Sequence, residues 1–109
     1  MHSTLQITFR DIAPSDAIDS YVRRRAEKLD SAEGRLVACH VAIEAPHRHK
    51  HHGRHYRVRV DLTVPGAALV VDRCPDEGHA CEDVYAAIDQ AFDHAVRRLR
   101  EAKQRRAVG

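Results

Sequence analysis

The sequence predicts an α+β fold, a two-layer sandwich in which one four-stranded sheet carries two helices packed on one face, in the order β-α-β-β-β-α. Three observations predict it. Four segments alternate apolar and polar residues as half-buried strands do, and two longer segments repeat apolar residues at helical spacing. The chain has 109 residues, of which 43% are hydrophobic, enough for one modest core but not for two. We therefore expect one domain, residues 1–109.

A strand and then a helix are predicted in the first third of the chain. Residues 4–9 alternate apolar and polar side chains, which is typical of a strand with one buried face. The period lengthens after Pro14, where Ser15 or Asp16 is placed to cap a helix that Gly34 is placed to end. This helix buries one stripe, with Tyr21 beside it: Ile18, Val22, Ala26 and Leu29.

Three more strands are predicted in the middle of the chain. Residues 36–45 and 56–64 alternate regularly, and residues 68–72 form the last strand. Pro65 and Gly66 occupy the second and third positions of a type II turn, so the last two strands form a hairpin. The residues expected to share one face are Val37, Cys39, Val41 and Ile43 in the first strand, and Tyr56, Val58, Val60, Leu62 and Val64 in the second.

A long helix is predicted at the end of the chain, after a loop of turn formers and acids at residues 73–83. The helix covers residues 82–106, with acidic residues at its positive end and basic residues at its negative end, as the helix dipole favours. A flexible tail is expected over residues 105–109. The apolar stripe comprises Val84, Ile88, Ala91, Phe92, Ala95, Leu99 and Ala102.

The lack of a targeting segment and the pattern of cysteines predict a cytoplasmic protein. Residues 1–10 lack the apolar run of a signal peptide, and no segment approaches the roughly 20 apolar residues that cross a bilayer. The three cysteines, Cys39, Cys74 and Cys81, are odd in number and have no paired metal spacing, so we interpret them as small, partly buried thiols.

The positive charge lies in two blocks. Residues 35–74 hold seven Lys or Arg against three Asp or Glu, and residues 94–109 hold six against one. Residues 75–93, between them, hold no cation and six acids. Such a distribution suits a surface that binds phosphates, since each cation near a nucleic-acid backbone releases condensed counterions. A solvated charged face would also explain it, and charge alone leaves the two open.

The element order and two helical segments resemble one family. "AIDSYVRRRAEKLD" and above all "EDVYAAIDQAFDHAVRRLREAKQRR" are similar to the ribosome hibernation promoting factor family, also called the ribosome-associated inhibitor A or light-repressed protein family. The resemblance covers nearly the whole chain, and "ITFR" and "EAPHRH" resemble a branch of that family with a His-rich loop. It also implies a fold like a double-stranded-RNA-binding domain.

The resemblance implies a non-enzymatic protein that needs no cofactor, no membrane and no small-molecule substrate. Family members bind ribosomal RNA of the small subunit between head and body, where messenger and transfer RNA would sit, and keep ribosomes silent under stress. Their basic side chains on the two helices contact the RNA. The matching positions are Arg23, Arg24, Arg25 and Lys28 on the first helix, and Arg97, Arg98, Arg100 and Lys103 on the last.

Helical geometry separates these cations. At about 100° per residue, most of the cations on the first helix project outward, whereas Arg25 falls close to the buried stripe and is expected to lay its stem on apolar surface. On the last helix Arg97 and Arg100 are expected on the exposed side and Arg98 nearer its edge. The chain ends at Gly109, without the linker and dimerisation domain of the family's long form, so we expect a monomer acting on individual ribosomes.

The stretch "EAPHRHKHHGRHY", residues 44–56, holds five of the nine histidines. His47, His49 and His51 alternate and His52 is adjacent, so neutral imidazoles there could bind zinc, copper or nickel. The loop's own cations oppose a metal, and we interpret it as a hairpin tip that contacts phosphates. The candidate RNA-binding cations in and after the loop are Arg48, Lys50, Arg54, Arg57 and Arg59.

Other function classes remain as alternatives. A small metal-binding His-loop protein and a general binder of structured RNA both fit parts of the pattern. An enzyme is not expected, because the chain has no nucleophile elbow, phosphate loop or spaced metal motif. Asp89 and Asp93 lie one helical turn apart, which we interpret as a solvated helix face and not as a catalytic carboxylate pair.

Overall fold

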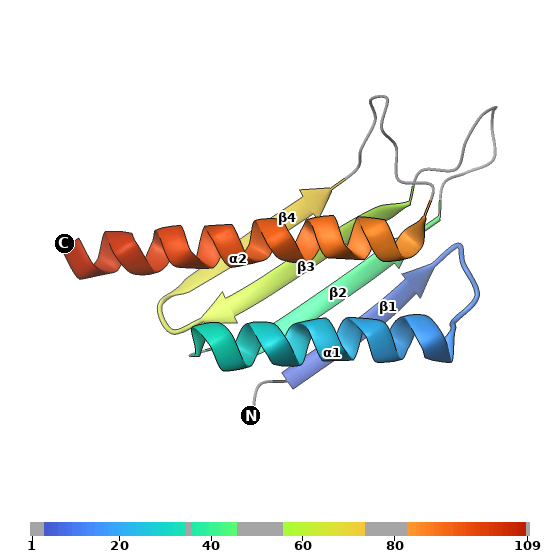
Figure 1. Cartoon of the computed structure of the whole chain (residues 1–109), viewed down its shortest axis with the longest axis horizontal. Helices are drawn as coiled ribbons and strands as arrows, with labels where there is room; N and C mark the ends of the chain where they lie inside the picture. Colours follow the sequence, from blue (N-terminus) through green and yellow to red (C-terminus); the bar gives the residue numbers. More distant parts are fainter. Residues whose placement is uncertain (1–3, 35, 46–55, 74–82, 109) are drawn as a thin grey trace.

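The computed structural model confirms the α+β sandwich and the order of its elements (Figure 1). It describes residues 4–34, 36–45, 56–73 and 83–108. Two helices lie side by side on one face of a four-stranded sheet. The elements are β1 (Thr4–Arg10), α1 (Asp16–Glu33), β2 (Ala38–Glu44), β3 (Arg57–Val64), β4 (Ala67–Arg73) and α2 (Val84–Val108).

The sheet is mixed and keeps the chain order β1-β2-β3-β4. β1 and β2 are parallel, and α1 is the crossover that such a connection requires. β2 pairs antiparallel with β3, and β3 with β4, so both predicted hairpins are confirmed. In the second, Val64 pairs with Ala67, and Gly66 has φ 82°, as the third position of a type II turn needs.

Local hydrogen bonds fix where the helices begin and end. The Ser15 hydroxyl accepts a hydrogen bond from the Ile18 amide at 3.2 Å, which identifies Ser15 as the cap of α1. At the other end Gly34, with φ 67°, donates its amide to the Asp30 carbonyl at 2.8 Å. The Asp83 side chain accepts from the Tyr85 amide at 2.9 Å, so α2 begins at Val84, two residues later than predicted.

The far end of α2 also differs from the prediction. The sequence predicts a helix to residue 106, whereas the helical backbone continues to Val108. None of the helices in the described ranges is long and apolar enough to cross a membrane.

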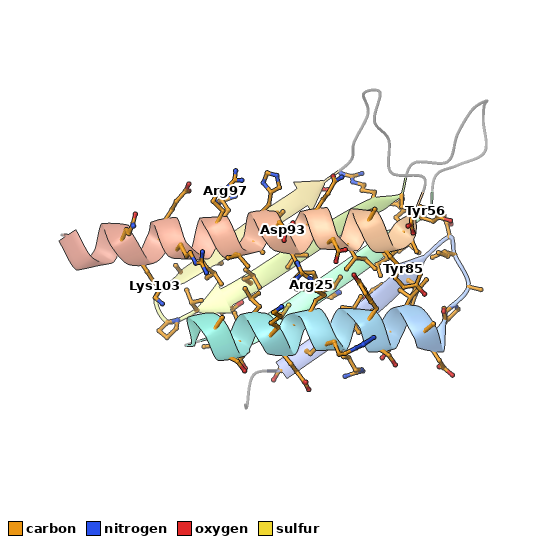
Figure 2. All side chains as sticks on the ribbon, in the orientation of Figure 1. Arg25, Tyr56, Tyr85, Asp93, Arg97 and Lys103 are labelled. Carbon is orange, nitrogen blue, oxygen red and sulfur yellow. The ribbon has the colours of Figure 1, made fainter. Side chains whose placement is uncertain are left out.

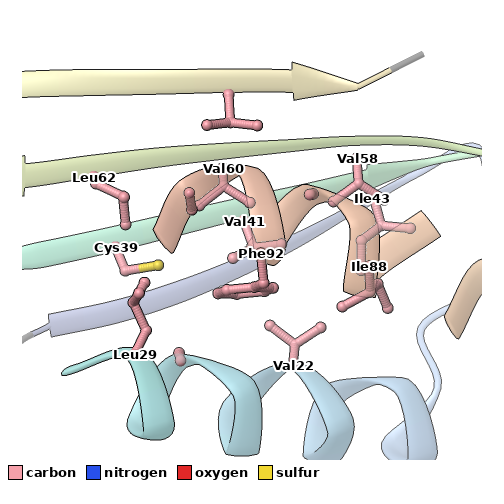
Figure 3. Packing of buried hydrophobic residues seen from close by; sticks show 14 of the residues in the cluster. Val22, Leu29, Cys39, Val41, Ile43, Val58, Val60, Leu62, Ile88 and Phe92 are labelled. Atoms are coloured by element: carbon pink, nitrogen blue, oxygen red, sulfur yellow. The ribbon is translucent and has the colours of Figure 1, made fainter. Parts of the chain in front are cut away.

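The core lies between the sheet and the two helices (Figure 3). Phe92 and Ile88 of α2 and Val22 of α1 are fully buried against the inner face of the sheet. Val37, predicted to share a face with Cys39, is 50% exposed. It lies just before β2, and Leu36 supplies the buried side chain there instead. The fully buried strand residues are Val41, Ile43, Val58, Val60 and Leu62.

Candidate nucleic-acid interface

The two helices are joined across their line of contact by polar and aromatic side chains, which we call the interhelix cluster: Tyr21 and Arg25 of α1, and Tyr85, Asp89 and Asp93 of α2. The Tyr21 hydroxyl donates to the Asp89 carboxylate, at 2.7 Å from Oδ1 and 2.9 Å from Oδ2. Its ring meets the Tyr85 ring edge to face, with centroids 5.0 Å apart. The hydrogen bond to Asp89, with burial as a lesser cause, raises the pKa of Tyr21.

Arg25 lies at the centre of this cluster (Figure 2). Its Nη2 donates to Asp93 Oδ1 at 3.1 Å and to the Asp89 backbone carbonyl at 3.5 Å, and its Nε lies 3.5 Å from Asp89 Oδ1. The guanidinium stands 5.5 Å from the centroid of the Phe92 ring, and the side chain is only 23% exposed. The predicted contact of Arg25 with apolar surface is therefore confirmed, and its charge faces two carboxylates of α2.

The other cations predicted on α1 divide between its two flanks. Arg24 and Lys28 are exposed, and the Arg24 guanidinium lies 5.8 Å from the centroid of Tyr21, on the flank nearer α2. Arg23 lies on the other flank. Its Nε donates to Asp19 at 2.6 Å, an ion pair between residues one helical turn apart. Arg23 is therefore paired with an acid of its own helix.

The second half of α2 carries exposed cations. Figure 2 shows Arg97 projecting from the layer of helices and Lys103 on the flank of α2 nearer α1. Arg100 is exposed as well. Arg98 donates from Nη1 to the backbone carbonyl of Val70 at 3.1 Å, which ties α2 to the edge strand β4 and agrees with its expected place near the edge of the helix. We call the set Arg24, Lys28, Arg97, Arg98, Arg100 and Lys103 the helix cations.

The predicted cations of β3 lie on the opposite face of the sheet and are paired with acids. Arg57 binds Asp72 with two hydrogen bonds of 3.0 Å, which lower the pKa of Asp72. Arg59 donates to Asp61 at 3.1 Å. Because the pairs are exposed, each contributes little to stability, but together they balance the charge of this face.

A histidine and a threonine extend the polar network on the same face. The Nε2 of His40 lies 2.9 Å from the Thr8 hydroxyl, and its Nδ1 lies 4.0 Å from Asp61. The neighbours of His40 on the open face of the sheet are thus side chains of β1 and β3.

The predicted loop residues are outside the described part of the chain. Arg48, Lys50 and Arg54 belong to this segment, as do the histidines proposed as metal ligands: His47, His49, His51 and His52. Within the described ranges no three His, Cys, Asp or Glu side chains are grouped to hold a metal. Cys39 is buried, and burial is the main cause that raises its pKa to about 12, which makes the thiol unreactive at neutral pH.

Sequence reasoning missed the partners of Arg25. Asp89 and Asp93 are exposed, as the predicted solvated face implies, but both also accept from side chains of α1. A signal for this existed in the sequence. An arginine close to the buried stripe of one amphipathic helix and two acids one turn apart on another are able to meet when both helices cover the same sheet.

Comparisons with known proteins identify what the chain is similar to. A family model described as "Sigma 54 modulation protein / S30EA ribosomal protein" matches residues 5–107. A curated relative, the ribosome hibernation promotion factor of Deinococcus radiodurans, is 31% identical over 100 residues, 92% of this chain. The match covers 49% of that relative, so the chain spans about half of its length.

Two solved structures share the fold. The N-terminal domain of Thermus thermophilus Protein Y superposes with a TM-score of 0.68 at 24% identity, over 93% of this chain and 98% of that one. A ribosomal subunit interface protein from Coxiella burnetii superposes with a TM-score of 0.74 at 14% identity, again over 93% and 98%.

The Tyr21 hydroxyl provides a test of the interhelix cluster. Replacing Asp89 with Asn removes the charge but keeps an acceptor, so the pKa of Tyr21 should fall toward its ordinary value. In the wild type, where the folded-state pKa is raised, the contribution of Tyr21 to stability is complete below the unfolded-state pKa and is lost as the pH rises through the folded-state value. Ultraviolet titration of the phenols, compared with Tyr21→Phe, measures the shift. An unchanged titration in Asp89→Asn would contradict this geometry.

Proposed function

The chain belongs to the sigma 54 modulation protein / S30EA ribosomal protein family, and from this premise we propose that it is a cytoplasmic ribosome hibernation factor. In this proposal it binds ribosomal RNA of the small subunit in the channel of messenger and transfer RNA, and it silences or protects idle ribosomes under stress. It acts by occupying the channel and needs no catalytic group.

The observation that carries the proposal is the position of the helix cations. All six are exposed on the layer of helices, and four of them lie in residues 94–109, a segment with six Lys or Arg and one Asp or Glu. A phosphate approaching this segment meets an excess of cations, whereas on the open face of the sheet Arg57 and Arg59 face Asp72 and Asp61. This asymmetry favours binding through the helices, where each phosphate contact releases counterions.

Folded RNA suits this surface better than single strands. Tyr21 and Tyr85 pack against each other, and Tyr56 packs against the core, so the described tyrosines are engaged within the protein. A single strand would need aromatic faces on which its bases could stack. Cations spread over two rigid helices instead match phosphates held at fixed positions by RNA structure.

The other predicted contacts in the described part of the chain are less favourable places for a phosphate. Arg23 would have to leave Asp19, and Arg57 and Arg59 would have to leave their acids, before binding a phosphate.

We also propose that the domain acts as a monomer on individual ribosomes. Its helices bury their apolar stripes against their own sheet, and Arg98 occupies a carbonyl of edge strand β4, which disfavours pairing between copies. Sedimentation of the free protein as a dimer would contradict this.

Co-sedimentation with purified ribosomal subunits in sucrose gradients tests the proposed function. The protein is expected to migrate with the small subunit, to be displaced by messenger and transfer RNA, and to be unaffected by a chelator. Unrelated duplex RNA should compete weakly. Absence from the small-subunit fraction together with stoichiometric metal binding would instead favour the metal-binding His-loop protein, and strong competition by duplex RNA would favour the general RNA binder.

Substituting cations on the two faces tests which face binds. The double variant Arg97→Gln with Arg100→Gln should lower small-subunit affinity on the order of tenfold or more, and should reduce the slope of log affinity against log salt by about 0.7–0.9 per lost contact. The matched control, Arg57→Gln with Arg59→Gln, also removes two positive charges but should change affinity much less. An equal loss in both double variants would contradict binding through the helices.

The loop is a separate accessory contact in this proposal. Replacing Arg48, Lys50 and Arg54 with Ala should weaken small-subunit binding and lower its salt dependence, and the histidines should strengthen binding below about pH 6 as they gain charge. Binding measured at two salt concentrations and two pH values is sufficient. Unchanged affinity and salt slope would remove the loop from the interface and leave the role of the helices intact.

A further inference from the structure

We propose that Arg25 is a positioning residue and not an RNA contact. By neutralising Asp89 and Asp93 and tying α1 to α2, it joins the cations of the two helices into one phosphate-binding surface. The inference rests on the proposed function, because it concerns how that surface is assembled. It departs from the resemblance, which places Arg25 among the RNA contacts.

The contacts of Arg25 are already with protein groups. Its guanidinium reaches the carboxylates of Asp93 and Asp89 and the backbone carbonyl of Asp89, and one side of it lies near Phe92. Its Nε is buried and makes no hydrogen bond in the structure. To reach a phosphate, the side chain would have to leave these partners and expose two uncompensated carboxylates. A phosphate contact would have to replace the two carboxylates, the carbonyl and the Phe92 ring at once.

The acids that Arg25 neutralises lie where a phosphate would approach. The Asp93 side chain is 72% exposed and that of Asp89 is 45% exposed, both on the flank of α2 that faces α1. Arg100 lies on the same flank about two turns beyond Asp93. Without Arg25, two negative charges would stand between the cations of α1 and those of α2 and would repel an RNA backbone.

The cluster also sets the register of the helices. Tyr21 to Asp89 and Arg25 to Asp93 each span 68 positions, and they lie one turn apart on both helices. Two such links fix both the spacing and the offset of parallel helices, which one link could not do (Figure 2). The same offset places Lys28 level with Val96, directly before Arg97. Arg25 therefore positions Lys28 beside the basic half of α2.

A double-mutant cycle on small-subunit affinity tests this role. Arg25→Met, which keeps an unbranched stem against Phe92, is measured in the wild type and in a background carrying Asp89→Asn and Asp93→Asn. We expect a loss of about tenfold when the carboxylates are present and of less than about twofold when they are absent. A direct phosphate contact would give the same loss in both backgrounds, and that result would overturn the proposal.

Lys28→Met is the matched control on the same helix. As an exposed cation it should lower affinity equally in both backgrounds and reduce the salt slope, whereas Arg25→Met should depend on the carboxylates. Circular dichroism and thermal unfolding verify that each variant is folded. Arg25→Lys keeps the charge but not the planar guanidinium, and it is measured in the same two backgrounds. It should lose less small-subunit affinity than Arg25→Met, and the loss should again depend on the carboxylates.

The outcomes separate this inference from the function on which it rests. If the wild-type protein does not bind the small subunit, the proposed function fails. If the wild type binds and Lys28→Met weakens it, but either substitution of Arg25 gives an equal loss in both backgrounds, the function stands and the positioning role is wrong.

Discussion

Burial of the single apolar face of the sheet is the constraint on which the rest of the structure depends. The inner sides of β2 and β3 are fully apolar, and both helices must lie on them to exclude water. Because α1 and α2 lie side by side in the same layer, the flanks that face each other become neighbours. The charges of two segments more than 60 residues apart in the sequence are thereby brought onto one surface.

The same constraint explains why the two sides of the domain differ in chemistry. The outer side of the sheet has no covering layer, and its charged side chains pair across strands, as Arg57 does with Asp72. The helices bury their apolar stripes and have whole flanks left for cations, of which Arg97 and Lys28 are examples. In the proposed function, this difference favours docking through the layer of helices.

The fold could be predicted from the sequence because its signals are local. Alternation in residues 56–64, the Pro-Gly turn and the cap at Ser15 each depend on neighbours only a few positions away. The exposure of Val37 could not be predicted from its alternation with Cys39, because it depends on where β2 begins. The surface was predicted less completely, since the partners of a charge lie across elements: Arg25 meets Asp93 at a separation of 68 positions.

The interhelix cluster also explains why acids occur in a helix that we assign to RNA binding. Asp83 lies just before α2, Asp89 and Asp93 lie in its first half, and the helix becomes basic only in its second half, in agreement with its dipole. α1 runs parallel to it (Figure 1) but has no basic residue in its last turn, so the division into an acidic and a basic half belongs to α2. In the proposed function, an RNA backbone is repelled by the first half of α2 and attracted by the second, which favours one orientation of the domain as well as one face. Arg25 contacts Asp89 and Asp93 where the acidic first half of α2 gives way to its basic second half, and it offsets their negative charge there.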